Sequence, residues 1–105
     1  MKIRNLTPHP VNLFVGNEWV VLPPDGPAPR VATIEVPINE DLPFVGVKVE
    51  YGDIQDLPPQ EDGVALIVSL LCCQAAPERP DLWYPTRLVR DEQGHVVGCG
   101  ALARI

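Results

Sequence analysis

Apolar and polar residues alternate along much of the chain, in short runs separated by proline, glycine and asparagine. Alternation of this kind predicts β-strands, because successive side chains of a strand point to opposite faces of a sheet. The expected strands cover residues 2–6, 11–15, 18–22, 30–36 and 44–51. The last of these alternates most clearly, and one of its faces consists of Val45, Val47, Val49 and Tyr51.

Two short polar segments predict β-hairpins. Gly16-Asn17 lies between the second and third expected strands and can supply the positive φ angles that a two-residue turn requires. Later in the chain, residues 91–94 separate two strand-like runs, 87–90 and 95–97. Their composition predicts a type I turn with Gly94 in the left-handed conformation.

Other segments interrupt or reshape the strands. Proline-rich or acidic composition predicts loops at 23–29, 39–41 and 53–63. Residues 82–84 lie between two prolines and are expected to be extended. Glycines on both sides of Cys99 predict a β-bulge there.

The most apolar part of the chain predicts a buried strand followed by a helix. Residues 64–68 are continuously apolar, and Ser69 is a suitable N-cap for two helical turns that Pro77 would end. A single buried helix over 64–76 is the alternative, but the β-branched residues favour a strand. The expected fold is therefore mostly β (α+β), a small rolled antiparallel sheet or barrel with one short helix near 69–76.

Length, composition and charge narrow the class of protein. A chain of 105 residues with 46% hydrophobic and 21% charged residues is expected to form one folded domain. The formal net charge is −6, and the acidic residues are concentrated in the middle of the chain. This charge argues against binding to a nucleic acid duplex or to an anionic membrane surface.

The cysteines indicate a reducing compartment. There are three, two of them adjacent, which is unlike the paired spacing of a secreted disulfide framework. No signal-peptide pattern and no run of about 18 apolar residues is present. We therefore expect a cytoplasmic protein with reduced thiols, in the host cytoplasm if the gene belongs to a phage.

No group of residues predicts catalysis, a metal site or a cofactor. His95 and Cys99 would lie on one face of a strand but about 13 Å apart, too far for a nucleophile and its base. Adjacent cysteines and isolated histidines are a poor zinc ligand set. Ser69 opens a helix that could face an anion, but a simple cap is the more economical interpretation. The chain is expected not to be an enzyme.

The segment Asn5-Leu6-Thr7-Pro8-His9-Pro10 is the most distinctive motif. Each proline forces the residue before it into an extended conformation, so Thr7 and His9 are held stiffly. Rigid polar side chains can form a binding edge, or they can shape the entry of the chain into a sheet. The sequence leaves both alternatives open.

The aromatic residues and arginines offer a second candidate site. Trp19 lies within a hairpin and is compatible with a core position, whereas Trp83-Tyr84 between prolines is less easily buried. An exposed aromatic pair near arginines can stack on a nucleotide base. The same features also suit a contact between protein chains, which is the more common use.

Several motifs together resemble a family of small proteins from phages, prophages and bacteria that has no settled activity. The motifs that carry the resemblance are Asn5-Leu6-Thr7-Pro8-His9, Arg30-Val31-Ala32, Tyr51-Gly52, Val68-Ser69, Ala75-Ala76-Pro77, Arg79 with Asp81-Leu82, Val89-Arg90-Asp91 and Gly98-Cys99. The resemblance implies a phage or mobile-element setting and not a reaction.

In that setting we expect a non-enzymatic accessory binding protein. It would counter host defence by sequestering a nucleotide-like small molecule or by occluding a host protein. The expected ligand-binding residues are Asn5, Thr7 and His9 for hydrogen bonds, Arg30, Arg79 and Arg90 for phosphate, and Trp83 or Tyr84 for stacking. The alternative function is structural: a phage assembly protein that forms a homo-oligomer through its aromatic edge.

Overall fold

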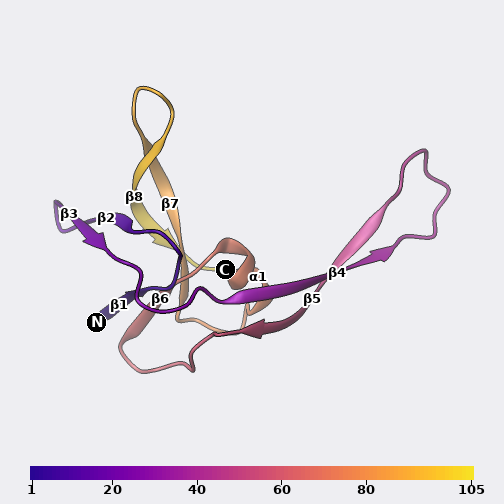
Figure 1. Ribbon diagram of the computed structural model, residues 1–105, viewed down its shortest axis with the longest axis horizontal. Helices are drawn as coiled ribbons and strands as arrows, with labels where there is room; N and C mark the ends of the chain where they lie inside the picture. The colour runs from indigo at the N-terminus through magenta and orange to yellow at the C-terminus, as the bar shows by residue number, and fades with distance from the viewer.

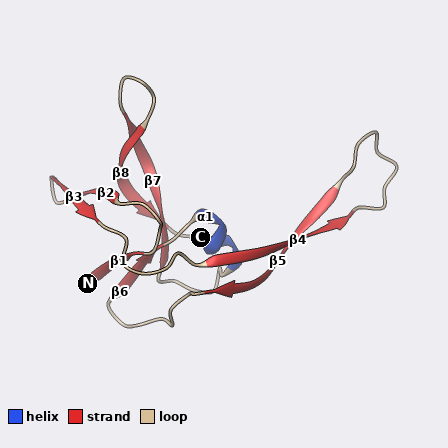
Figure 2. Ribbon diagram, viewed as in Figure 1, coloured by secondary structure: helices blue, strands red, loops and turns tan.

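The computed structural model describes residues 1–105, which form eight strands and one short helix (Figure 1). The fold is mostly β, as expected, and Figure 2 shows how little of it is helical. The elements are β1 (Lys2–Asn5), β2 (Val11–Val15), β3 (Glu18–Leu22), β4 (Arg30–Pro37), β5 (Val47–Gln55), β6 (Val64–Ile67), α1 (Leu70–Ala75), β7 (Leu82–Arg90) and β8 (Val96–Ala103).

Six strands form a rolled, nearly closed sheet in the order β1-β6-β7-β8-β2-β3. The two ends of this order approach each other, because Asn5 of β1 forms a parallel bridge with Pro24, just beyond β3. The amide of Asp25 also donates to the carbonyl of Asn5 at 2.7 Å. The small rolled sheet is therefore confirmed.

The sheet is mixed, which corrects the expectation of an antiparallel one. The pairs β1–β6, β6–β7 and β2–β8 are parallel, and only β2–β3 and β7–β8 are antiparallel. The antiparallel pairs are the two hairpins that turn residues predict. The parallel pairs join segments far apart in the sequence, where no turn signal exists.

The core lies where β6 leads into the helix. Buried apolar residues there form one cluster of Leu6, Leu66, Val68, Cys72, Cys73, Ala76 and Leu82. Ser69 caps the helix, since its hydroxyl accepts from the amide of Cys72 at 3.1 Å. The strand-then-helix prediction is confirmed and the single helix over 64–76 is wrong. No helix is long and apolar enough to cross a membrane.

Both predicted turns have the positive φ angles expected at their glycines, but the β-bulge expected around Cys99 lies elsewhere. Gly16 and Asn17 have φ angles of 55° and 70°, and Gly94 has a φ of 85°. The register of β7 and β8 shifts between Val89 and Arg90, opposite Val97, and not around Cys99. Gly98 instead leaves room for Trp19, whose ring atom Cζ3 would lie 2.7 Å from a Cβ at that position. Trp19 itself is 47% exposed, so it is not a core residue.

Strands β4 and β5 form a separate two-stranded sheet that projects from the body (Figure 1). We call residues 30–55 the β4–β5 arm. The strand expected at 44–51 is present but starts at Val47 and extends to Gln55. The arm makes the molecule elongated, with extents of 53 × 38 × 20 Å. The radius of gyration is 16.5 Å, whereas a compact domain of this length has about 13 Å.

Candidate interaction surfaces

Asn5 is the centre of a hydrogen-bond network at the end of β1. Its side chain is buried, and Nδ2 donates to the carbonyls of His9 and Leu22, each at 2.8 Å. Oδ1 accepts from the amide of Thr7 at 2.9 Å and lies 2.6 Å from the Thr7 hydroxyl. Both amide hydrogens and both acceptor positions are thus used within the protein. No atom of this side chain is left for the ligand contact expected from the sequence.

Thr7 and His9 complete this network in different ways. The Thr7 hydroxyl lies 2.9 Å from the carbonyl of His9 as well as close to Asn5, and its single proton can serve one of the two. The motif therefore shapes the entry of the chain into β2, which is one of the two alternatives stated above. The imidazole of His9 is exposed and forms no hydrogen bond.

Arg79 is held in a largely buried ion pair. Its Nε and Nη2 donate to the two carboxylate oxygens of Asp81 at 2.9 and 2.8 Å, and Nη2 also donates to the carbonyl of Pro58 at 2.8 Å. The hydrogen bond to Asp81 raises the pKa of Arg79, so the guanidinium stays charged. This arrangement fastens the acidic loop after β5 to the start of β7.

The three arginines expected to bind phosphate belong to three separate parts of the fold. Arg30 begins the β4–β5 arm and is exposed. Arg90 lies near the far end of the β7–β8 hairpin, where its Nη1 donates to the carbonyl of Gly94 at 2.9 Å. Arg79 follows α1. Figure 1 shows that the arm and this hairpin point in different directions, so the structure does not gather these arginines into one site.

Trp83 and Tyr84 are half-buried in β7. Tyr84 packs against the core cluster. The guanidinium carbon of Arg104 lies 5.3 Å from the ring centroid of Trp83, so an arginine from the chain itself already stacks on this ring. Arg104 did not stand out in the sequence. Only the pairing of β7 with β8 brings it beside a residue twenty-one positions earlier.

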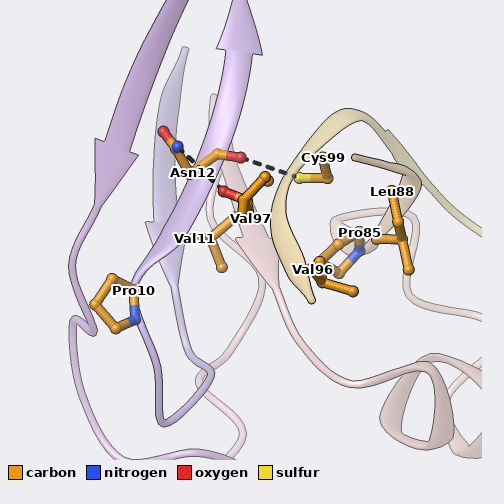
Figure 3. A pocket seen from close by; sticks show the side chains of 9 residues that line it. Pro10, Val11, Asn12, Pro85, Leu88, Val96, Val97 and Cys99 are labelled. Carbon is orange, nitrogen blue, oxygen red and sulfur yellow. Dashed lines mark hydrogen bonds between the residues drawn. The ribbon is translucent and has the colours of Figure 1, made fainter. Parts of the chain in front are cut away.

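A small cleft lies between β2, β7 and β8 (Figure 3). It has a volume of about 160 Å³ and is lined by Pro10, Val11, Asn12, Pro85, Leu88, Val96, Val97, Gly98 and Cys99. The thiol of Cys99 faces the carbonyl of Asn12 at 3.7 Å, and Nδ2 of Asn12 donates to the carbonyl of Val97 at 3.2 Å. The lining contains no charged side chain, so it offers nothing to bind a phosphate.

The thiols are buried and unreactive. Burial raises the pKa of Cys72 and Cys99. Burial and the neighbouring Cys72 raise the pKa of Cys73 to about 11. A thiol is a nucleophile only as the thiolate, so at neutral pH these three act as small apolar residues. No group of three or more His, Cys, Asp or Glu residues is placed to hold a metal ion.

The β4–β5 arm carries the most extensive exposed apolar surface. Residues directly opposite each other in an antiparallel pair share a face, so the register defines two faces of the arm. The valine face carries Val47, Val49 and Tyr51 from β5, with Glu35 opposite Val49. The isoleucine face carries Ile34 and Val36 from β4 and Ile38 just beyond it. Glu50 lies opposite Ile34, Lys48 opposite Val36 and Gly46 opposite Ile38.

Beyond its base, where Val31 and Ile54 pack against the core cluster, both faces of the arm lack a covering layer. Ile34, Val36, Val47, Val49 and Tyr51 are between 37% and 54% exposed. Alternation in a strand ordinarily reflects burial of one face, yet neither face of the projecting part of the arm is buried within this chain. The arm is therefore the strongest candidate for contact with another protein chain.

No protein family model matches the chain, and neither the curated proteins nor the solved structures gave a match.

Proposed function

We propose that this is a non-enzymatic assembly protein that forms a homo-oligomer through the β4–β5 arm. One observation carries the proposal. The chain exposes 7331 Å², whereas a compact monomer of 11.5 kDa exposes about 5,800 Å². The difference of about 1,500 Å² exceeds the ~800 Å² that each partner buries in a standard protein interface.

The location of this surplus surface supports a protein partner. The projecting arm contributes exposed surface on two faces, each of which carries a row of apolar side chains. Monomeric proteins rarely expose apolar patches of this extent unless the patch binds something. A two-stranded sheet is also only marginally stable in water by itself. Contact with another chain would supply the missing layer.

The biological setting is part of the proposal. The resemblance of the sequence motifs to small phage and prophage proteins suggests an accessory or assembly role in a phage or mobile element. Three free cysteines fit the reducing host cytoplasm as the place where the protein folds.

Sequestration of a nucleotide-like molecule is the weaker candidate. The expected arginines lie on separate elements, and two of them bind groups of the protein itself. The cleft of about 160 Å³ is smaller than the roughly 300–1,000 Å³ typical of small-molecule sites. The larger hollow of about 500 Å³ at the base of the arm contains only one of the expected ligand-binding residues, Arg30. Occlusion of a host protein would use the same exposed arm, so the oligomeric state of the purified protein separates these functions.

The test is the mass of the purified protein in solution, by light scattering and by native mass spectrometry. We expect an oligomer for the wild type and a monomer for I34T/V36T, because threonine keeps strand propensity but removes apolar surface. V21T is the matched control, since Val21 is exposed on β3, away from the arm. A monomeric wild type contradicts the proposal. A small molecule released on denaturation would favour sequestration.

A further inference from the structure

The isoleucine face is better suited to meet its own copy than the valine face is. At the middle of the valine face, Glu35 lies opposite Val49. When two copies of this face meet in opposite directions about their middle, the two Glu35 carboxylates oppose each other. When they meet in the same direction, each carboxylate is pressed onto an apolar residue. Burial of an unpaired carboxylate is costly in both cases.

The pairing on the isoleucine face selects a direction for the contact. Ile34 has Glu50 beside it, and Val36 has Lys48 beside it. Two arms that run in the same direction would place β4 of one copy over β5 of the other. Ile34 would then cover a partner carboxylate and Val36 a partner ammonium group. Apolar residues would cover charges at both of these levels, which opposes association.

Two arms that run in opposite directions place β4 over β4 and β5 over β5. With the two-fold axis at the level of the Glu35–Val49 pair, Ile34 of one copy packs on Val36 of the other. Lys48 of each copy then faces Glu50 of the other. Because a two-fold contact occurs twice, this direction forms two apolar contacts and two ion pairs at its centre.

The β4 row of this face continues on both sides of the centre, while the pairing of β4 with β5 shifts between Val31 and Thr33. Arg30 and Ala32 continue the alternation of β4 toward the body, and Glu40 lies in the loop at the far end. Counting outward from the axis along β4 places Ile38, one residue beyond the strand, opposite Ala32 of the other copy. Ala32 lines a hollow of about 500 Å³ at the base of the arm together with Arg30, Ile34, Gly52 and Asp53. Apolar residues thus meet on both sides of the central pairs.

From this complementarity we infer that two copies of the chain form a two-fold dimer by packing the isoleucine faces of their β4–β5 arms in opposite directions. Figure 1 shows the arm extending clear of the body, so a second arm can lie along it. Two-stranded ribbons are strongly twisted, and two equal ribbons can coil around each other while staying in contact. The inference rests on the proposed function and adds its geometry. The valine face remains exposed for further assembly.

The test is a charge swap across the two-fold axis. The dissociation constants of the wild type, K48E, E50K and K48E/E50K are measured by sedimentation over a dilution series. We expect a wild-type dimer of about 23 kDa, twice the chain mass. Each single reversal sets like charges against each other at two places and should raise the dissociation constant about 10-fold or more. The double variant restores opposite charges and should return to within about threefold of the wild type.

A general effect of net charge on association predicts a different result, so the two single reversals distinguish it from the proposed contact. K48E takes the formal charge of the chain from −6 to −8, and E50K takes it to −4. General repulsion between acidic chains would therefore make E50K associate more tightly, whereas the opposed-arm contact weakens both. Circular dichroism and thermal midpoints check that the wild type and the three variants are folded.

The outcomes separate this inference from the proposed function. A wild-type dimer that neither single reversal weakens, or that the swap fails to restore, overturns the arm geometry and leaves the homo-oligomer standing. A wild type that stays monomeric throughout the dilution series overturns both.

Discussion

Replacing Asn5 by alanine is the sharpest test of how this fold is held together. The substitution removes the donor to the Leu22 carbonyl and the acceptor for the Thr7 amide. The His9 carbonyl keeps a partner, because the Thr7 hydroxyl lies 2.9 Å from it. Two part-buried backbone groups therefore lose their partners, at a cost of up to about 1–3 kcal/mol each. We expect the free energy of unfolding to fall by about 3 kcal/mol.

That loss is large for this molecule. Domains of this size are stable by about 5–15 kcal/mol, and only 14 of the 105 residues are buried. The small core places the protein toward the lower end of that range. N5A should therefore lose much of the free energy of unfolding. If the wild type lies at about 5 kcal/mol, a measurable fraction of N5A should be unfolded at room temperature.

The assay is urea unfolding followed by circular dichroism at one fixed protein concentration, because association shifts the midpoint. N39A is the matched control: Asn39 is exposed in the loop of the arm, so its change should stay within about 0.5 kcal/mol. T7V removes only the hydroxyl and should cost about 1 kcal/mol. An N5A protein as stable as N39A would refute the structural role of Asn5 and revive its role as a ligand residue.

Two further predictions concern packing and pH. G98A should lower the free energy of unfolding by about 1–3 kcal/mol, because the new Cβ would lie 2.7 Å from the Trp19 ring. G100A is the control: its new Cβ would have its nearest neighbour at 3.5 Å, so the free energy of unfolding should hardly change in the same urea assay. Burial raises the pKa of Cys73 from 9.0 to about 11 in the folded state. Between these two values the unfolded chain loses the thiol proton while the folded chain keeps it. The contribution of Cys73 to stability is therefore complete below pH 9 and is lost as the pH rises toward 11. Urea midpoints measured from pH 8 to 11 should fall, and C73A should fall less steeply; equal slopes would contradict the buried-thiol explanation.

Local signals predicted the local structure well. Gly16-Asn17 forms its tight turn and Ser69 caps its helix, because the turn and the cap are decided by residues within a few positions. The parallel pairing of β1 with β6 joins Lys2 to Val64. No residue near either strand encodes that partner, so the mixed character of the sheet could not be predicted from turns.

The candidate site shows the same limit. An asparagine at position 5 can donate hydrogen bonds to a ligand or to backbone groups of its own chain, and the sequence left both roles open. The decisive partner is the Leu22 carbonyl, 17 residues away, which comes within 2.8 Å only when β3 returns past β1. Arg104 was overlooked for a related reason, since it reaches Trp83 only through the register of β7 and β8, which includes an irregularity.

For the arm, the strand was predicted correctly, but the sequence did not show what covers its apolar face. Alternation from Val45 to Tyr51 predicted a strand with an apolar face, and an apolar face implies a covering layer. Nothing in a sequence states whether that layer belongs to the same chain. The structure shows both faces of the arm uncovered beyond its base, and the register shows that its charges alternate with its apolar rows in a pattern that one opposed copy can satisfy. A strand pattern that finds no intramolecular partner is therefore a signal for assembly. In the proposed dimer, Lys48 and Glu50 would make that signal specific.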